Sequence, residues 1–291
     1  MPELPEVEAL ARFLSAEAGG RRITRVELAA VAALKTFDPP LDALVGGTVA
    51  GCWRRGKFLC LEAGLPAKDT MWLVLHLARG GWVRLREQMA TTRARQGRGP
   101  LALRVGLEPG GGLEVSEAGT EKRLAVYVVR SPDEVPGIAR LGPDALDPAL
   151  DAQTLRARLA ATGGQLKSAL TDQTVLAGVG NAYSDEVLHV ARLSPFKSAA
   201  RLSEEEGVRL HQAMVELLTD AVARSVGLPG GELKSEKRSG MRVHGRAGEV
   251  CPVCGDTVRE VSFATSALQY CPTCQTGGKP LADRRLSRLL K

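Results

Sequence analysis

Short apolar runs, separated by turn residues, recur through the first 130 residues and predict β-strands. The helical spacing of apolar residues over 6–18 instead predicts a helix that ends at Gly19 and Gly20. The chain therefore begins with one helix, followed by a β-sandwich or barrel. We expect strands at 23–28, 47–53, 57–63, 72–77, 82–87, 101–107, 113–115 and 123–129.

The pattern changes after residue 130. Residues 131–143 contain three prolines and no regular period, which indicates a linker, and residues 151–226 follow a helical pattern. Residues 227–240 are rich in glycine and lysine, and we expect them to be mobile. The predicted division is a β-sandwich domain, a helical domain, and a cysteine-containing module with a basic tail, at 1–134, 135–245 and 246–291.

Charge suggests a polyanionic partner. The 291 residues carry a net charge of +6, and the segment from 231 to 291 holds 11 basic against 6 acidic residues. A basic end on a nearly neutral body favours nucleic acid. The longest apolar run, 71–78, is too short to cross a membrane, and the acidic start is no signal peptide. We therefore expect a cytoplasmic protein with no membrane partner.

Four of the six cysteines have the spacing of a metal site. Cys251 and Cys254, then Cys271 and Cys274, form two C-x2-C pairs separated by sixteen residues. Four thiolates enclose Zn²⁺ tetrahedrally and leave no position for a catalytic water, so we expect one structural zinc. Two disulfides or free thiols are the alternatives, and a cytoplasmic-type chain disfavours disulfides. The remaining pair, Cys52 and Cys60, falls in predicted strands as small buried groups.

The N-terminus offers a candidate nucleophile. Removal of Met1 would leave Pro2 with a free secondary amine. An α-amino group has a pKa near ~7.7, so about a sixth of it is neutral at pH 7 and able to attack a carbonyl-like carbon. Glu3 and Glu6 could handle protons. Proline followed by glutamate is also ordinary chemistry for the start of a helix, and this alternative stays open.

A glycine-containing turn between two predicted helices offers a phosphate-binding position. Backbone N–H groups at Gly180 would face outward at a helix N-terminus, and Asn181 adds an amide. A dinucleotide loop is disfavoured because Tyr183 stands where its third glycine would be, and because the turn does not follow a strand.

Four motifs in order resemble the formamidopyrimidine-DNA glycosylase / endonuclease VIII family: PELPEVE at the N-terminus, GKFL at 56–59, VLAGVGNAYSDEVL at 175–188, and the terminal cysteines. The resemblance covers nearly the whole chain. It implies an α+β fold with an N-terminal β-sandwich and opening helix, a helical domain with a helix–two-turn–helix, and a C-terminal β-hairpin zinc finger. It also implies a monomer that binds damaged double-stranded DNA in the cleft between its domains.

The resemblance implies roles for matching residues. Pro2 is the expected nucleophile on C1′ of the damaged nucleotide, Glu3 the acid that assists sugar opening and departure of the base, and Glu6 a supporting acid. Lys57 matches a phosphate-contacting lysine that belongs to the catalytic site. The expected DNA contacts elsewhere are Asn181, Gly180, Arg123 and Lys167, of which Lys167 is a candidate for the catalytic pocket. For each basic residue the alternative is a solvated surface charge.

Three positions depart from the family pattern. Arg79 stands where the oxidised-purine branch commonly has a methionine that fills the hole left by an everted base. Arginine could intercalate there, or it could contact only phosphate. Ser266 stands where the finger usually has an arginine aimed at the phosphate beside the lesion, so a charge-assisted contact is lost. Residues 230–241 are shorter than the loop that caps 8-oxoguanine.

The sequence thus predicts a bifunctional DNA glycosylase and AP lyase of base excision repair, with oxidised pyrimidines or abasic sites slightly favoured over 8-oxoguanine. An oxidised-purine glycosylase is the enzymatic alternative. The alternative of another class is a catalytically impaired homologue that binds damaged DNA. Ser266 and Arg79, which replace the usual family residues, are the reason for this alternative. A general zinc-dependent DNA-binding module would explain the basic end but leave PELPEVE without a function.

Overall fold

The computed structural model describes residues 1–66, 69–97, 99–263 and 266–282. The chain forms two compact units, which are described separately. The first contains residues 1–140 and 224–234, and the second contains residues 141–223 and 235–291. The predicted division into three parts stays a prediction.

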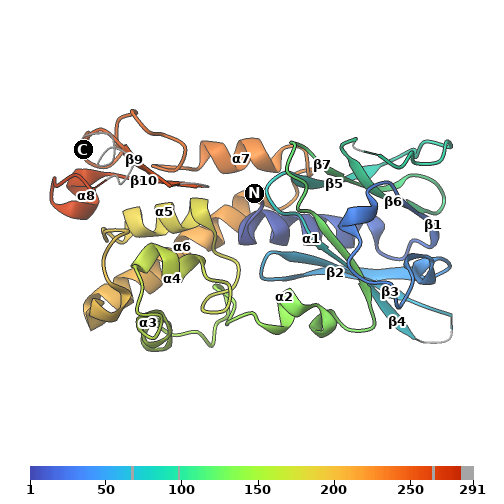
Figure 1. The fold of residues 1–291 in the computed structure, drawn as a ribbon, viewed down its shortest axis with the longest axis horizontal. Helices are drawn as coiled ribbons and strands as arrows, with labels where there is room; N and C mark the ends of the chain where they lie inside the picture. The colour runs from blue at the N-terminus through green and yellow to red at the C-terminus, as the bar shows by residue number, and fades with distance from the viewer. Residues whose placement is uncertain (67–68, 98, 264–265, 283–291) are drawn as a thin grey trace. The chain divides into compact units, whose positions relative to one another are not determined.

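The first unit is a β-sandwich with an opening helix, α1 (Leu4–Ala18). Two antiparallel four-stranded sheets have the orders β1-β6-β7-β5 and β2-β3-β4-β8, and α1 packs against β2 and β3 (Figure 1). The strands are β1 (Ile23–Leu28), β2 (Thr48–Arg55), β3 (Phe58–Gly64), β4 (Thr70–His76), β5 (Gly81–Arg86), β6 (Leu101–Leu107), β7 (Gly112–Glu117) and β8 (Ala125–Val129).

The short apolar runs form this core. Leu59 pairs with Leu75 and Leu61 with Leu73 across β3 and β4, and all four side chains are at most 2 % exposed. All eight expected strands are present, with ends shifted by at most two residues. One of the two-residue shifts concerns β7, which was expected to end at residue 115. It continues to the buried Glu117 because that carboxylate accepts backbone N–H groups from the approach to β8.

The second unit is helical and ends in a small antiparallel hairpin. Its helix α5 packs against α4, against β10 and against α8. These elements are the helix–two-turn–helix and the C-terminal hairpin that the resemblance implied, so the predicted α+β class is confirmed. The bounds are α3 (Ala152–Ala160), α4 (Leu166–Thr171), α5 (Asn181–Val190), α6 (Glu204–Ser225), β9 (Arg259–Ser262), β10 (Ala267–Tyr270) and α8 (Pro272–Thr276).

Two segments contain helical structure that the sequence analysis did not predict. The expected linker 131–143 contains short helical turns, η3 (Pro132–Glu134) and α2 (Pro136–Ala139). Residues 227–240, expected to be mobile, contain the helix α7 (Leu233–Ser239), because Leu233 is fully buried in the core of the first unit. Of the described helices, none has both the length and the apolar character that a membrane span requires. The basic tail lies largely outside the described residues.

Candidate nucleic-acid interface and metal centre

The N-terminal segment holds two buried carboxylates at the start of α1. Glu3 and Glu6 are each 2 % exposed, and Pro2 is also buried. The backbone N–H of Glu3 donates to Oε2 of Glu6 at 2.8 Å, and the side chain of Glu3 accepts from the backbone of Glu6. This reciprocal capping box satisfies backbone donors that a helix start leaves free. The two carboxylates predicted to act together are therefore held side by side.

Lys57 lies at the turn between β2 and β3 and is 7 % exposed. The adjacent Phe58 ring packs on His76, with ring centres 4.8 Å apart. Burial lowers the pKa of His76, and the Lys57 ammonium acts in the same direction. Lys57 and His76 are therefore neighbours, which the sequence analysis did not foresee for His76.

The two candidate arginines of the first unit are exposed. Arg79 lies in a turn closed by a hydrogen bond from Gly81 N to Leu77 O at 2.8 Å. Gly80 in this turn has no room for a side chain, because a Cβ would lie 2.2 Å from the Ala118 carbonyl oxygen. Arg123 extends into solvent beside Glu121, at 3.2 Å.

A buried ion pair organises the second unit. Nζ of Lys167 donates to Oδ1 of Asp185 at 2.6 Å and to Oγ of Ser184 at 2.8 Å. The other oxygen of Asp185 is 2.8 Å from Nδ1 of His244 and accepts the backbone N–H of Gln269 at 3.2 Å. Lys167 is therefore an internal partner of α5, and its predicted place in a catalytic pocket stays a prediction.

The next carboxylate of α5 binds backbone alone. Glu186 is 1 % exposed and accepts N–H groups from Arg242, Val243 and His244 at 2.8 to 2.9 Å. Burial raises the pKa of Glu186, and the three backbone donors oppose that rise. A carboxylate surrounded by three donors fastens the chain that leads into the finger.

The start of α5 brings two predicted DNA contacts close to the finger hairpin. Gly180 caps the helix, and Asn181 is its first residue. The amide of Asn181 donates to the Ala267 carbonyl at 2.9 Å. The neighbouring Ser266 is exposed, and its carbonyl accepts the N–H of Phe263 in the hairpin turn. Asn181 and Ser266, which are 85 positions apart in the sequence, therefore lie close together where the start of α5 meets the finger hairpin.

The four predicted zinc ligands converge. Sγ of Cys254 is 3.3 Å from Sγ of Cys271, and Sγ of Cys251 is 3.9 Å from Sγ of Cys274. Zn–S bonds of about 2.3 Å in a tetrahedron separate the sulfurs by about 3.8 Å, so the four thiols fit the ion. Burial raises the pKa of Cys271 to about 11, and a bound cation would reverse this.

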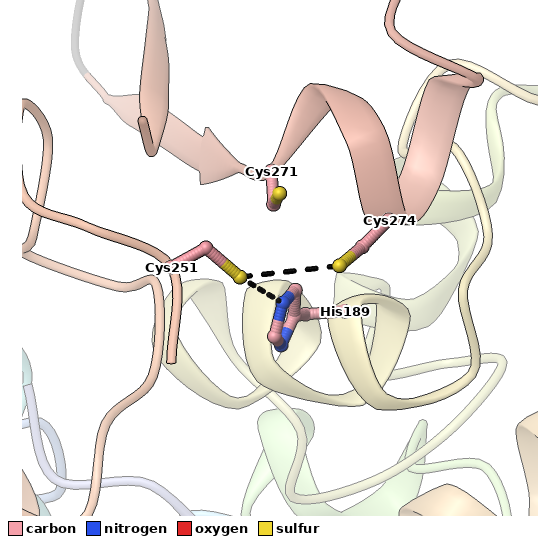
Figure 2. A group of neighbouring side chains, drawn as sticks. All are labelled: His189, Cys251, Cys271 and Cys274. Carbon is pink, nitrogen blue, oxygen red and sulfur yellow. Dashed lines mark hydrogen bonds between the residues drawn. The ribbon is translucent and has the colours of Figure 1, made fainter. Parts of the chain in front are cut away.

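One further donor lies at the metal centre. His189, near the end of α5, places Nε2 3.3 Å from Sγ of Cys251. One of its ring nitrogens forms a group with the sulfurs of Cys251, Cys271 and Cys274, all within 4.8 Å of one another (Figure 2). Burial lowers the pKa of His189 to about 4, with Arg242 and Arg192 acting in the same direction. The sequence analysis missed His189, although it lies four residues after Asp185 on the same helix.

Family models match all three parts of the chain. Residues 1–117 match the formamidopyrimidine-DNA glycosylase N-terminal domain, and residues 141–228 match its H2TH domain. Residues 248–277 match a zinc finger found in FPG and IleRS. A sandwich, a helix–two-turn–helix and this finger in order define a class of DNA-repair proteins.

Individual relatives agree with this class. Formamidopyrimidine-DNA glycosylase of Symbiobacterium thermophilum is 35% identical over 98% of this chain and 93% of its own length. An uncharacterized formamidopyrimidine-DNA glycosylase-like protein of Mycobacterium tuberculosis is 63% identical over 52% of this chain and 94% of its own length. The chain belongs to the formamidopyrimidine-DNA glycosylase family, and its finger is one structural zinc site.

Solved structures of relatives have the same fold. A Lactococcus lactis FPG mutant in complex with Fapy-dG-containing DNA has a TM-score of 0.81 and 28% identity, covering 94% of this chain and 100% of that one. A complex of the Lactococcus lactis Fpg with abasic-site DNA has a TM-score of 0.81 and 27% identity, covering 94% and 99%.

Asp185→Asn should destabilise the protein strongly. The substitution leaves the buried Lys167 ammonium without its carboxylate, and breaking one partner of a buried pair typically costs about 3 to 5 kcal/mol. Denaturant unfolding measures the loss. The control is Glu205→Gln, which removes an exposed pair with Arg209 and should cost less than about 1 kcal/mol. Equal losses from both variants would contradict a central role for Asp185.

Cys271→Ser should release the metal. A serine hydroxyl is a poor zinc ligand, and metal binding contributes to folding of such modules. We expect zinc content, measured by atomic absorption on purified protein, to fall well below the one ion per chain of the parent. Cys60→Ala is the control, since Cys60 lies in β3 of the first unit. Full zinc content in the Cys271 variant would refute the ligand assignment.

Proposed function

We propose that this protein is a bifunctional DNA glycosylase and AP lyase of base excision repair, with the nitrogen of Pro2 as nucleophile. The observation that carries the proposal is the pair of buried carboxylates, Glu3 and Glu6, directly beside Pro2 in a chain of this family. The proposal requires removal of Met1, because an amide nitrogen cannot attack. Because its proposed substrate is DNA, we propose that the protein acts in the cytoplasm.

The proposed chemistry begins with eversion of the damaged nucleotide, at a few kcal/mol. The neutral amine of Pro2 attacks C1′, a C–N bond forms, and the glycosidic bond breaks while Glu3 supplies a proton that assists departure of the base. The Pro2 nitrogen then loses its proton, the C1′–O4′ bond breaks as O4′ takes up a proton, and the opened sugar is left joined to Pro2 as an iminium at C1′. The iminium acidifies the C2′ protons, so β- and then δ-elimination expel the two flanking phosphates. Water finally releases the sugar fragment from Pro2.

Phosphate contacts would hold the sugar against the amine. Lys57 and Asn181 are the proposed contacts flanking the lesion, supported by their match to the family motif, and Arg123 contributes a charge farther along the backbone. Binding energy gained at these phosphates offsets the eversion cost and orients the reacting carbon. The complexes of the Lactococcus lactis relative with abasic-site DNA and with Fapy-dG-containing DNA support this class of substrate.

Oxidised pyrimidines or abasic sites are the proposed lesions. Support comes from the segment before Met241, which contains only the seven-residue helix α7 where the purine branch has a longer capping loop. Nζ of Lys237 in this helix lies 4.5 Å from the ring centre of Tyr183. A cation over an aromatic face favours this packed arrangement over a free loop. Arg79 in place of the void-filling methionine also supports a different opposite-base preference.

Two alternatives have specific support. The names of the relatives favour an oxidised-purine glycosylase. Ser266, exposed in the finger turn, brings no charge where the family usually has an arginine, and this favours a catalytically impaired binder of damaged DNA.

Pro2→Gly should abolish or severely slow borohydride trapping on a duplex with an abasic site, because the secondary amine is lost. Binding of the same duplex should survive. The measurement is the covalent protein–DNA band on a denaturing gel, with intact mass establishing that Met1 is absent. Pro5→Ala is the matched control: its nitrogen is an amide within α1, so trapping should persist. Trapping that persists in the Pro2 variant, or equal loss of trapping and binding, would refute the nucleophile assignment.

A panel of duplexes should separate the lesion classes. One sequence would carry an oxidised pyrimidine, 8-oxoguanine or an abasic site, and single-turnover cleavage would be compared. We expect faster cleavage at oxidised pyrimidines and abasic sites than at 8-oxoguanine. Fastest cleavage at 8-oxoguanine would select the purine alternative, and binding without cleavage would select the impaired binder.

Ser266→Arg should tighten duplex binding roughly tenfold, since one charge-assisted hydrogen bond contributes about 1.5 to 3 kcal/mol.

A further inference from the structure

Five donor side chains surround a metal site that has four positions. The four thiols lie at separations that suit one tetrahedral ion, and Nε2 of His189 is 3.3 Å from Sγ of Cys251. Structural zinc sites are closed and four-coordinate. If the four sulfurs fill the site, the imidazole must lie outside it and act on a ligand.

The chemistry of Cys251 decides the direction of this contact. A metal-bound cysteine is a thiolate, which accepts hydrogen bonds and cannot donate them. Nε2 of His189 must then carry the hydrogen, and Nδ1 must be the bare nitrogen. Nδ1 is buried and has no hydrogen-bond partner within the described part of the chain, so no acceptor there competes with the thiolate for the hydrogen. Both nitrogens therefore agree with one tautomer.

The hydrogen bond from His189 to Cys251 also reduces the negative charge on the metal-bound sulfur. Four thiolates around Zn²⁺ leave two excess negative charges. Cys251 is only 1 % exposed, so water molecules cannot fully hydrate its sulfur. A hydrogen bond from Nε2 spreads part of that charge onto the imidazole. Groups that hydrogen-bond to metal ligands in this way orient the ligand and slow its loss.

We propose that His189 is a positioning residue of the zinc finger: it donates Nε2–H to the Cys251 thiolate and thereby fastens the metal centre to helix α5. The helix presents Asn181, Asp185 and His189 at intervals of four residues, and each contacts the finger or the chain that leads into it. His189 is thus the last of a row of polar contacts on one helical face.

The test measures zinc release from full-length, zinc-loaded protein into an excess of a chromophoric chelator. His189→Phe keeps a ring of similar size without a donor and should release zinc about 10- to 100-fold faster, which is typical for loss of such a partner. His189→Gln places an N–H near the former Nε2 and should stay within about threefold of the parent. His189→Asn, one methylene shorter, cannot reach and should release zinc as fast as the Phe variant.

His211→Phe is the matched control. His211 lies on α6 and its Nε2 contacts the Leu150 carbonyl at 2.7 Å, so the variant loses a histidine hydrogen bond of the same unit without touching the metal. Its release rate should equal that of the parent. Equal release rates for the parent and the Phe and Asn variants would overturn the proposal, as would a His211 variant as fast as the His189 variants.

Cobalt substitution distinguishes a hydrogen bond from direct ligation and does not depend on the Phe variant folding. The parent and His189→Gln should both give the charge-transfer intensity and ligand-field bands of four thiolates. Cys254→Ser should lose the part of the charge-transfer intensity that one thiolate contributes. A three-sulfur, one-nitrogen spectrum in the parent would overturn the proposal, because His189 would then be a ligand. So would a Cys254→Ser spectrum identical to that of the parent.

Discussion

One buried carboxylate, that of Asp185, holds together the helical part of the chain and the finger. A charge removed from water is tolerated only when every lone pair finds a partner, and Asp185 has Lys167, His244 and the backbone of Gln269. Its partners come from three separate stretches of sequence. The orientation of α5 against β10, and with it the approach of Asn181 to the hairpin, depends on this arrangement being complete.

Most of the fold follows from the hydrophobic pattern. Strands such as β1 and β6 match the prediction residue for residue, because each is a short apolar run whose residues pack into the core of the sandwich. The errors arise where one side chain outweighs its neighbours. Leu233 lies among lysines, glycines and glutamates, yet its burial accompanies a helix where a mobile segment was expected.

The site was only partly predictable, for a related reason. Cysteine spacing identifies a metal module directly, since few other functions require that pattern, and the fold and comparisons support it. Asp185, Glu186 and His189 do recur at helical intervals, but polar residues at such intervals usually mark a solvated face. Only the fold reveals that this face is buried. The roles of Pro2 and Lys57 rest on family resemblance, because no local pattern distinguishes a reactive N-terminus from an ordinary helix start.

The hydrogen bonds that attach residues 242–244 to Glu186 determine which substitutions this segment tolerates. Its carboxylate recognises three main-chain N–H groups, at residues 242 to 244, and touches none of their side chains through these bonds. Every amino acid except proline supplies the same group. At the exposed Arg242, substitutions that alter charge or size can therefore accumulate without weakening this attachment, whereas the buried Val243 and the Asp185 partner His244 are constrained by their own side chains.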